Sequence, residues 1–475
     1  MPDRATPVME YTSTFLDEAA IHSALARAAA PDHALISDVL AKAAVLKGLT
    51  MEEAAVLLNA TEPHSVEAIF AAARDAKKTI YGSRIVLFAP LYLSNFCVNN
   101  CLYCGFRVDN KDLARVALDK AEIEEETRIL LKQGHKRVLL VTGQTPKYSS
   151  LDYIEMAVKA VYSMHGPADS RIRRINVNAA PMSVEDFKRL KSFGIGTYQC
   201  FQETYHRETY RVMHPSGPKA SYDWRVTAMH RALEAGIDDV GIGALFGLYD
   251  HRFETLATIM HAQALDKTFN IGPHTVSIPR LEPALNAPAA MNPPARVGDD
   301  DMKLIVAVLR LALPYTGIIL STREAPELRD EMIRLGVSQI SAGSRTNPGG
   351  YKDAESNDEC TEQFVVADTR NMDQIINALV KMGMVPSMCT ACYRLGRTGE
   401  RFMEEAKSGH IHTYCLPNAI LTFKEYLMDF ASPQTKTDGE KTIREQVAAM
   451  AETPLKHSLV DRLERIEKGE RDLYF

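Results

Sequence analysis

The sequence has no long apolar run, since no stretch approaches the roughly 18 uninterrupted apolar residues that a membrane span requires. It also has no basic block: 55 Lys and Arg are outnumbered by 61 Asp and Glu, which gives a net charge of −6. Phosphate binding needs a concentrated footprint of Lys and Arg, so nucleic acid is not expected as a partner. The first twenty residues contain no continuous apolar core, and they predict neither a signal peptide nor a transit peptide. We therefore expect a cytoplasmic protein with no membrane or nucleic-acid partner.

Cysteine is scarce and unevenly placed. Eight cysteines occur in 475 residues, and disulfides are not expected in a cytosolic protein because that compartment keeps thiols reduced. We interpret Cys200, inside a predicted strand, and Cys360, in a predicted connection, as inert thiols. The other six form two groups of three, which predict two metal sites. These groups are Cys97, Cys101 and Cys104, and Cys389, Cys392 and Cys415.

The length and the residue pattern predict three parts. A barrel of about 250 residues plus further structure fits the length. Residues 1–84 carry apolar residues at helical spacing, with Thr50 and Glu53 as a capping box, and are expected to form a helical cap. Residues 85–346 are expected to form the barrel. Residues 347–475, which begin with the connection 347–360, are expected to form a mainly helical domain that ends in one long helix near 445–469.

The middle part alternates short β-branched runs with amphipathic stretches. Eight strands with seven helical connections are the number needed for a closed parallel (β/α)8 barrel, whereas an open doubly wound sheet would not require eight. The α/β class with a TIM-type barrel is therefore the predicted fold. The expected strands are 85–93, 137–143, 173–179, 196–202, 239–247, 274–280, 317–323 and 337–343.

The first cysteine group has the pattern C-x3-C-x2-C just after the first expected strand. In a barrel this position lies on the C-terminal face, where active sites are found. Three thiolates can hold three irons of a [4Fe-4S] cubane and leave the fourth iron open to a ligand. A structural zinc site is the alternative, but zinc normally takes a fourth protein ligand and none stands at a suitable spacing nearby.

This triplet, with Tyr103 before its last cysteine, resembles the signature of the radical S-adenosylmethionine (SAM) superfamily. The resemblance implies that the open iron binds the amino and carboxylate groups of SAM, and that one-electron reduction cleaves SAM to a 5′-deoxyadenosyl radical. It also implies a set of SAM contacts on the barrel strands, although a glycine at a strand end can equally be a packing site. The implied contacts are Tyr103, Thr142, Gly143, Gln144, Thr145, Glu203, Gly241 and Gly243.

The second group, C-x2-C-x22-C, has two possible interpretations on chemistry alone. Three thiolates suit a second iron–sulfur cluster. His410 and His412 lie close in sequence to Cys415 and could complete a Cys3His zinc site instead.

A radical SAM barrel followed by this C-terminal triplet resembles the HydG family, the tyrosine lyases of [FeFe]-hydrogenase maturation. The resemblance implies an auxiliary cluster with one extra iron, of [5Fe-5S] type, with free L-cysteine as a possible further ligand. It implies cleavage of L-tyrosine at Cα–Cβ to p-cresol and dehydroglycine, followed by conversion of dehydroglycine to CO and cyanide for the hydrogenase cluster. A ferredoxin- or flavodoxin-like electron donor and transient contacts with other maturation proteins are also implied.

Two other functions remain possible. The thiazole-pathway tyrosine lyases resemble this chain in barrel and substrate, but they lack the C-terminal triplet and stop at dehydroglycine. A non-catalytic iron–sulfur scaffold or carrier would bind iron without cleaving SAM.

Side chains for the substrate and for an extra iron are expected at opposite ends of the barrel. Arg323 is the first candidate for the tyrosine carboxylate because a guanidinium offers two parallel donors, and Ser321 and Thr322 can add hydroxyl contacts. Arg280 is the second candidate, with a structural salt bridge to Glu324 or Glu282 as the alternative. His274, at the start of the sixth strand, is the candidate ligand for an extra iron, with a hydrogen-bonded core histidine as the alternative.

Overall fold

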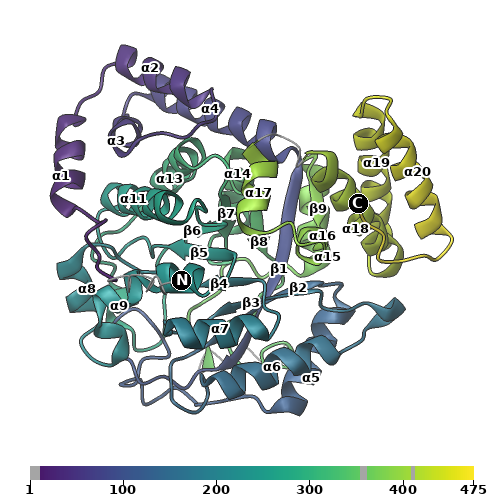
Figure 1. Ribbon diagram of the computed structural model, residues 1–475, viewed down its shortest axis with the longest axis horizontal. Coiled ribbons are helices and arrows are strands. Elements are labelled where there is room, and N and C mark those ends of the chain that lie inside the picture. Colours follow the sequence, from purple (N-terminus) through teal and green to yellow (C-terminus); the bar gives the residue numbers. More distant parts are fainter. Residues whose placement is uncertain (1–10, 354–360, 408–411) are drawn as a thin grey trace, which may run out of the picture.

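The structure is a computed structural model that describes residues 11–353, 361–407 and 412–475 (Figure 1). Cys360 and His410 lie outside these residues, and the side chain of His412 is not described either. The expectations that concern these three residues therefore stay predictions.

The predicted barrel is confirmed. Eight parallel strands follow one another in chain order, and β1 pairs with both β2 and β8, which closes the sheet. All eight expected strands are present, although each strand from β4 to β8 is three or four residues shorter than expected. Their bounds are β1 Arg84–Ser94, β2 Arg137–Thr142, β3 Arg174–Asn178, β4 Thr197–Gln199, β5 Asp239–Gly243, β6 Thr275–Ser277, β7 Gly317–Leu320 and β8 Gln339–Ser341.

Strand β1 is long enough to pair at two levels of the barrel. Its C-terminal part, from Ala89 onward, pairs with β2, and its N-terminal part, from Val86 to Phe88, pairs with β8. The lowest residues, Arg84 to Val86, pair in parallel with a ninth strand, β9 (Val385–Ser387). Only helices are predicted from the sequence beyond residue 350, so β9 is an element that the sequence pattern does not indicate. A three-residue strand with a central proline carries no alternating pattern, and it exists because β1 extends below β2 and offers it a free edge.

Helices cover the barrel. Most of the crossovers are formed by α5 (Lys120–Lys132), α6 (Leu151–Ser163), α7 (Val184–Ser192), α11 (His251–Phe269), α13 (Asp299–Ala312) and α14 (Pro326–Leu335). The link from β4 to β5 is broken into α8 (Arg207–Met213), α9 (Tyr222–Val226) and α10 (Ala228–Glu234), and a short α12 (Pro288–Met291) follows β6. No described helix combines the length and the apolar character that crossing a membrane demands.

The N-terminal helices pack on one side of the barrel (Figure 1). Thr50 and Glu53 form the predicted capping box at the start of α3. Helix α4 contacts α13 and α14, whereas α1 and α3 contact α11, so this segment covers barrel helices and contributes no strand. The bounds are α1 Glu18–Arg27, α2 His33–Ala43, α3 Met51–Leu58 and α4 Pro63–Tyr81.

The helices after residue 411 lie on the opposite side of the barrel from α1 in Figure 1. The prediction of a single long helix near 445–469 is wrong. Two helices form, because Thr453 is extended and caps a new helix in which Pro454 is the first residue. The bounds are α15 Met372–Lys381, α16 Ala391–Arg394, α17 Gly399–Lys407, α18 His412–Asp429, α19 Pro433–Ala449 and α20 Pro454–Glu467.

Candidate functional site

A cavity of about 210 Å³ lies at the C-terminal ends of the barrel strands and contains the first cysteine triplet. Cys97, Cys101 and Cys104 all line it, on the loop between β1 and α5. Cys101 is buried and the other two are half-buried. The three thiols therefore line one cavity, at the end of the barrel where SAM is expected from the sequence.

Arg115 holds the backbone of this loop in place. Its guanidinium donates to the carbonyl oxygens of Asn95 and Arg107, both at 2.7 Å, of Phe106 at 2.8 Å and of Asn110 at 3.2 Å. One side chain thus ties together carbonyls on both sides of the three cysteines. Sequence reasoning missed this role because an isolated arginine in a loop carries no signal.

The loop also packs tightly against the end of β2. A Cβ added at Gly143 would lie 2.3 Å from the carbonyl oxygen of Phe96, so only glycine fits there. The amide of Val98 donates to the carbonyl of Gln144 at 2.9 Å, and the Asn99 side chain donates to the Gln144 side chain at 2.8 Å. Thr142, Gly143 and Gln144 accordingly line the cavity beside Cys97.

Glu203 is a half-buried carboxylate on the cavity wall, with its side chain 14% exposed. It accepts from Lys219 at 2.6 Å and from Arg225 at 3.4 Å. Burial by itself raises the pKa of Glu203, but Lys219 and Arg225 outweigh it and hold the pKa below its usual range. Its φ of 73° lies in the left-handed region, which a non-glycine residue keeps only when its surroundings impose it. The site therefore presents an ionised acceptor at a defined position.

Tyr103 is oriented by a partner that the sequence did not indicate. Its hydroxyl lies 2.7 Å from Nε2 of His214, while Nδ1 of His214 lies 2.7 Å from the carbonyl oxygen of Tyr210. Because that carbonyl can only accept, the proton sits on Nδ1 and Tyr103 donates to Nε2. The pKa of His214 is lowered by burial, which keeps the ring neutral.

Arg323, Ser321 and Thr322 also line this cavity. The Arg323 guanidinium stacks 3.3 Å from the centroid of the Phe364 ring. Its guanidinium forms no hydrogen bond or ion pair within the described part of the chain, although burial lowers its pKa. It is a cation that lines the cavity, and among the described residues no carboxylate is within ion-pair distance of it, although Glu203 and Glu282 are near enough to raise its pKa in part. Arg280 is different, because it is ion-paired with Glu324 and, at 2.7 Å, with Asp299, and it is not part of the cavity lining.

Three of the expected SAM contacts are not part of the cavity lining. Thr145 organises a turn, in which its amide donates to Ser149 and its hydroxyl accepts from the amide of Tyr148. Gly241 and Gly243 are packing positions, since a Cβ would lie 2.6 Å from Thr275 Oγ1 and 2.4 Å from the Ser277 carbonyl oxygen, respectively. The packing alternative considered for a glycine at a strand end therefore fits both glycines.

A second cavity, of about 60 Å³, lies at the opposite end of the barrel and contains the C-terminal triplet. Cys389 lies two residues after β9, Cys392 lies in α16 and Cys415 lies in the first turn of α18. All three line this cavity together with His274. Strand β9 is the element that brings Cys389 under the barrel, and Arg137 from β2 fixes it by donating to its carbonyl oxygen at 2.7 Å.

His274 is placed where the sequence analysis expected it, just before β6. Its Nε2 lies 3.1 Å from the hydroxyl of Tyr393, and its Nδ1 lies 3.8 Å from a carboxylate oxygen of Asp239. Burial lowers its pKa, so the ring is neutral and keeps a lone pair. The fold therefore brings together one imidazole and three thiols that are up to 141 positions apart in sequence.

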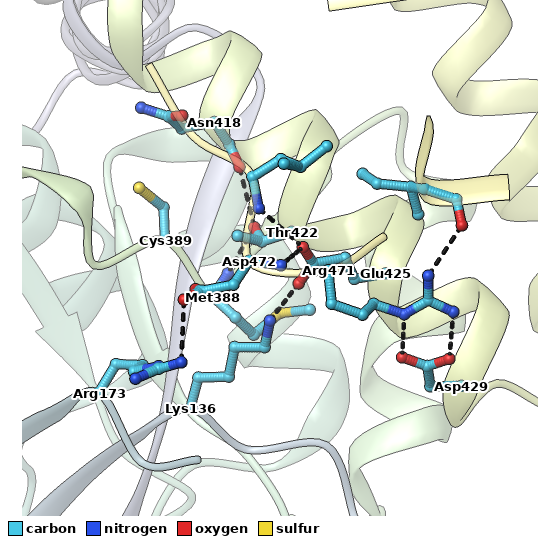
Figure 2. A network of polar contacts seen from close by, with 12 residues as sticks. Lys136, Arg173, Met388, Cys389, Asn418, Thr422, Glu425, Asp429, Arg471 and Asp472 are labelled. Atoms are coloured by element: carbon cyan, nitrogen blue, oxygen red, sulfur yellow. Dashed lines mark hydrogen bonds and ion pairs between the residues drawn. The ribbon is translucent and has the colours of Figure 1, made fainter. Parts of the chain in front are cut away.

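The last residues of the chain hold the cysteine-bearing helices against the barrel (Figure 2). Asp472 pairs with Arg173 at 2.9 Å and with Arg394 of α16 at 2.7 Å. Its amide donates to Glu425 of α18 at 2.6 Å, and Glu425 is ion-paired with Lys136 below β2. The helices of Cys392 and Cys415 are thereby connected to the base of β2 and β3.

The donor groups fit multi-iron clusters. Burial raises the pKa of Cys104 to about 12, and the neighbouring Cys101 and Cys97 raise it further. The three thiols therefore lose their protons together only when a nearby positive charge, such as that of bound iron, stabilises the thiolates. In the second cavity, a hydrogen bond from Cys392 and the nearby Arg84 and Arg397 lower the pKa of Cys415. Within the described residues no three Cys, His, Asp or Glu converge on one ion. A cubane does not need such convergence because each thiolate binds its own iron.

Known proteins match this chain over most of its length. Residues 91–261 match the family model of the radical SAM superfamily, and residues 277–385 match that of the biotin and thiamin synthesis associated domain. The 2-iminoacetate synthase of Escherichia coli (strain K12) is 32% identical over 355 residues, which cover 74% of this chain and 90% of that protein.

Two solved structures cover nearly the whole chain. A crystal structure of HydG, described as a maturase of the [FeFe]-hydrogenase, is 50% identical, covers 98% of this chain and 100% of its own, and has a TM-score of 0.94. HydG from Carboxydothermus hydrogenoformans is 42% identical with a TM-score of 0.82, and covers 94% of this chain and 97% of its own.

The chain belongs to the HydG family of the radical SAM superfamily. It is accordingly a radical SAM lyase, and a [4Fe-4S] cluster with SAM is the cofactor pair of its superfamily. The two models together end at residue 385, so the C-terminal triplet lies beyond both of them.

Proposed function

We propose that this chain cleaves L-tyrosine at Cα–Cβ to p-cresol and dehydroglycine, and converts dehydroglycine at a second iron–sulfur site to CO and cyanide for the [FeFe]-hydrogenase cluster. The observation that carries the proposal is the pair of cysteine cavities at opposite ends of one barrel. Similarity to 2-iminoacetate synthase supports the first reaction, and similarity to HydG supports the second.

Cys97, Cys101 and Cys104 would hold the first cluster, and SAM would complete it. When bound, this pair supplies a radical that abstracts a hydrogen atom. Thr142, Gly143 and Gln144 would surround SAM on the β2 side of the cavity. Glu203 would accept hydrogen bonds from SAM, and Tyr103, aligned by His214, would pack against it.

Arg323 would bind the tyrosine carboxylate. Its guanidinium lines the cavity, stacks on Phe364 and forms no ion pair or hydrogen bond among the described residues, so a substrate carboxylate would satisfy it with two parallel hydrogen bonds. Ser321 and Thr322 lie beside it. Burial excludes competing water from this contact, which strengthens it.

Cys389, Cys392 and Cys415 would hold the auxiliary cluster. His274 would offer a neutral imidazole to an extra iron of a [5Fe-5S]-type cluster, with free L-cysteine as a possible further ligand. A carboxylate oxygen of Asp239 lies 3.8 Å from Nδ1 of His274, and a carboxylate behind one ring nitrogen is the usual arrangement when the other binds a metal. The iron would take the place of the Tyr393 hydroxyl at Nε2. A ferredoxin- or flavodoxin-like protein would supply electrons, and other maturation proteins would receive the product.

The test is product formation from SAM, L-tyrosine and dithionite by anaerobically reconstituted protein. We expect wild type to release p-cresol and CO, Cys389→Ser to release p-cresol and almost no CO, and Cys97→Ser to release neither. The Cys97 variant is the matched control, because it also removes one thiol from a cluster site.

Each failure identifies a different alternative. p-Cresol without CO from wild type would indicate the thiazole-pathway reaction, which stops at dehydroglycine. Iron without 5′-deoxyadenosine would indicate a scaffold or carrier. About one zinc and only four irons per chain would make the C-terminal triplet a structural zinc site.

A further inference from the structure

Two side-chain amides donate to sulfur atoms of the first cysteine triplet. Nε2 of Gln363 lies 3.6 Å from Sγ of Cys104, and Nδ2 of Asn99 lies 3.6 Å from Sγ of Cys97. Both side chains belong to residues that line the first cavity. Hydrogen bonds to the sulfurs of an iron–sulfur cluster are among the features that set its reduction potential. These two amides are therefore placed to act on a cluster held by the triplet.

The side chain of Gln363 is held with its amino group toward Cys104. The hydroxyl of the buried Tyr92 donates to Oε1 of Gln363 at 2.8 Å, which leaves Nε2 on the side of the sulfur. A thiolate that binds iron carries no proton and can only accept, so the N–H of Gln363 suits it and the amide oxygen does not. Gln363 is only half-buried, so the pairing of a fully buried amide does not account for the contact.

The backbone of Gln363 is fixed against the cysteine loop. Its carbonyl oxygen accepts from the amide of Gly105 at 3.0 Å, and its own amide donates to the carbonyl of Thr346 at 3.0 Å. A Cβ at Gly105 would lie 2.9 Å from the carbonyl oxygen of Gln363, so this close approach requires glycine directly after Cys104. Gln363 thus stands beside Cys104 although 259 positions separate the two residues in sequence.

The amide of Asn99 has more than one structural role. Its amino group also donates to Oε1 of Gln144 at 2.8 Å, and its Oδ1 accepts from the amide of Lys219 at 2.8 Å. Replacing Asn99 would therefore disturb two other segments together with the contact to Cys97. Gln363 is the residue whose replacement tests the contact with sulfur most directly.

We propose that Gln363 is a positioning residue that raises the reduction potential of the first [4Fe-4S] cluster by donating an N–H···S hydrogen bond to Cys104. Reduction adds one electron from the external donor, and part of the added negative charge falls on the cysteine sulfurs. The hydrogen bond therefore stabilises the reduced form more than the oxidised form. This inference rests on the cluster that the proposed function assigns to the first triplet, and it requires neither tyrosine cleavage nor CO formation.

The experiment is a redox titration of the anaerobically reconstituted full-length protein, followed by the EPR signal of the reduced first cluster. The signal is assigned to this cluster by its change on addition of SAM, and the titration itself contains neither SAM nor tyrosine. Gln363→Met keeps the length of the side chain and removes the N–H. At a fixed potential the ratio of reduced to oxidised cluster should fall about tenfold, which is a shift of about 59 mV to lower potential for one electron.

Thr346→Val is the matched control. The Thr346 hydroxyl donates to the carbonyl of Phe364 at 2.9 Å, so this variant loosens the same segment and leaves the donor to sulfur in place. Its reduction potential should match that of wild type. Tyr92→Phe frees the amide of Gln363 to turn, and it should lower the potential by less than Gln363→Met does.

An unchanged potential in Gln363→Met, or an equal shift in Thr346→Val, would overturn the proposal. A wild-type protein without a SAM-sensitive signal would overturn the proposal and the assignment of the first cluster together. A lowered potential in Gln363→Met, combined with a wild type that makes neither p-cresol nor CO, would support the role of Gln363 and refute the proposed function alone.

Discussion

Removing the Arg115 side chain should loosen the first cysteine loop without unfolding the barrel. Arg115→Ala deletes four hydrogen bonds from one guanidinium to loop carbonyls. Each charged hydrogen bond contributes about 1.5–3 kcal/mol when water cannot replace it. Arg115 is only half-buried, so water can replace much of this, and we expect the loop to lose about 2–4 kcal/mol of local stability.

Hydrogen exchange measures this loss directly. In this loop the amide of Gly105 donates to the carbonyl of Gln363, from the segment after β8, and the amide of Val108 donates to the carbonyl of Asn99. Both amides should exchange roughly 30- to 700-fold faster in the variant. Amides of β3 should exchange as in wild type. Arg128→Ala is the control, since Arg128 makes only an exposed ion pair with Glu125. Loop exchange within about threefold of wild type would refute the clamp role, because 2 kcal/mol already exceeds that factor.

Two further predictions concern the substrate and pH. Arg323→Lys should raise the KM for tyrosine in p-cresol formation by about 10- to 150-fold, because an ammonium cannot form the paired hydrogen bonds of a guanidinium, whereas Arg280→Lys should leave KM near wild type; an unchanged KM for the Arg323 variant would contradict the assignment. Burial raises the pKa of Glu254 to about 8, so the folded state holds a proton that the unfolded state has released. The free energy of unfolding should therefore fall as pH rises from about 4.5 to about 8. In denaturant titrations the unfolding midpoint of wild type should fall over this pH range, and that of Glu254→Gln should fall less steeply. Equal dependence of the midpoint on pH in both proteins would show that Glu254 does not titrate in this range.

The sequence was sufficient for the barrel strands and the first cysteine triplet because these features are local. A β-branched run or a C-x3-C-x2-C spacing is complete within a dozen residues, and eight such runs with helical connections have one closed arrangement. The sequence is not sufficient where one local pattern fits two different structural roles. Gly241 and Gly243 look the same in sequence whether they approach a ligand or a neighbouring strand. The structure places Gly241 against Thr275 and Gly243 against Ser277.

Tertiary structure decided which distant segments support each cysteine group. Arg115, Lys219 and His214 act on the first site through contacts that close only when the loop folds back on the barrel. The second site depends on β9, a strand that forms because β1 extends below β2, and on His274, which lies 115 positions before Cys389. The sequence by itself determined which chemical groups this protein carries. Their grouping into two cavities depended on contacts between distant segments, whose energies arise only once the barrel has closed.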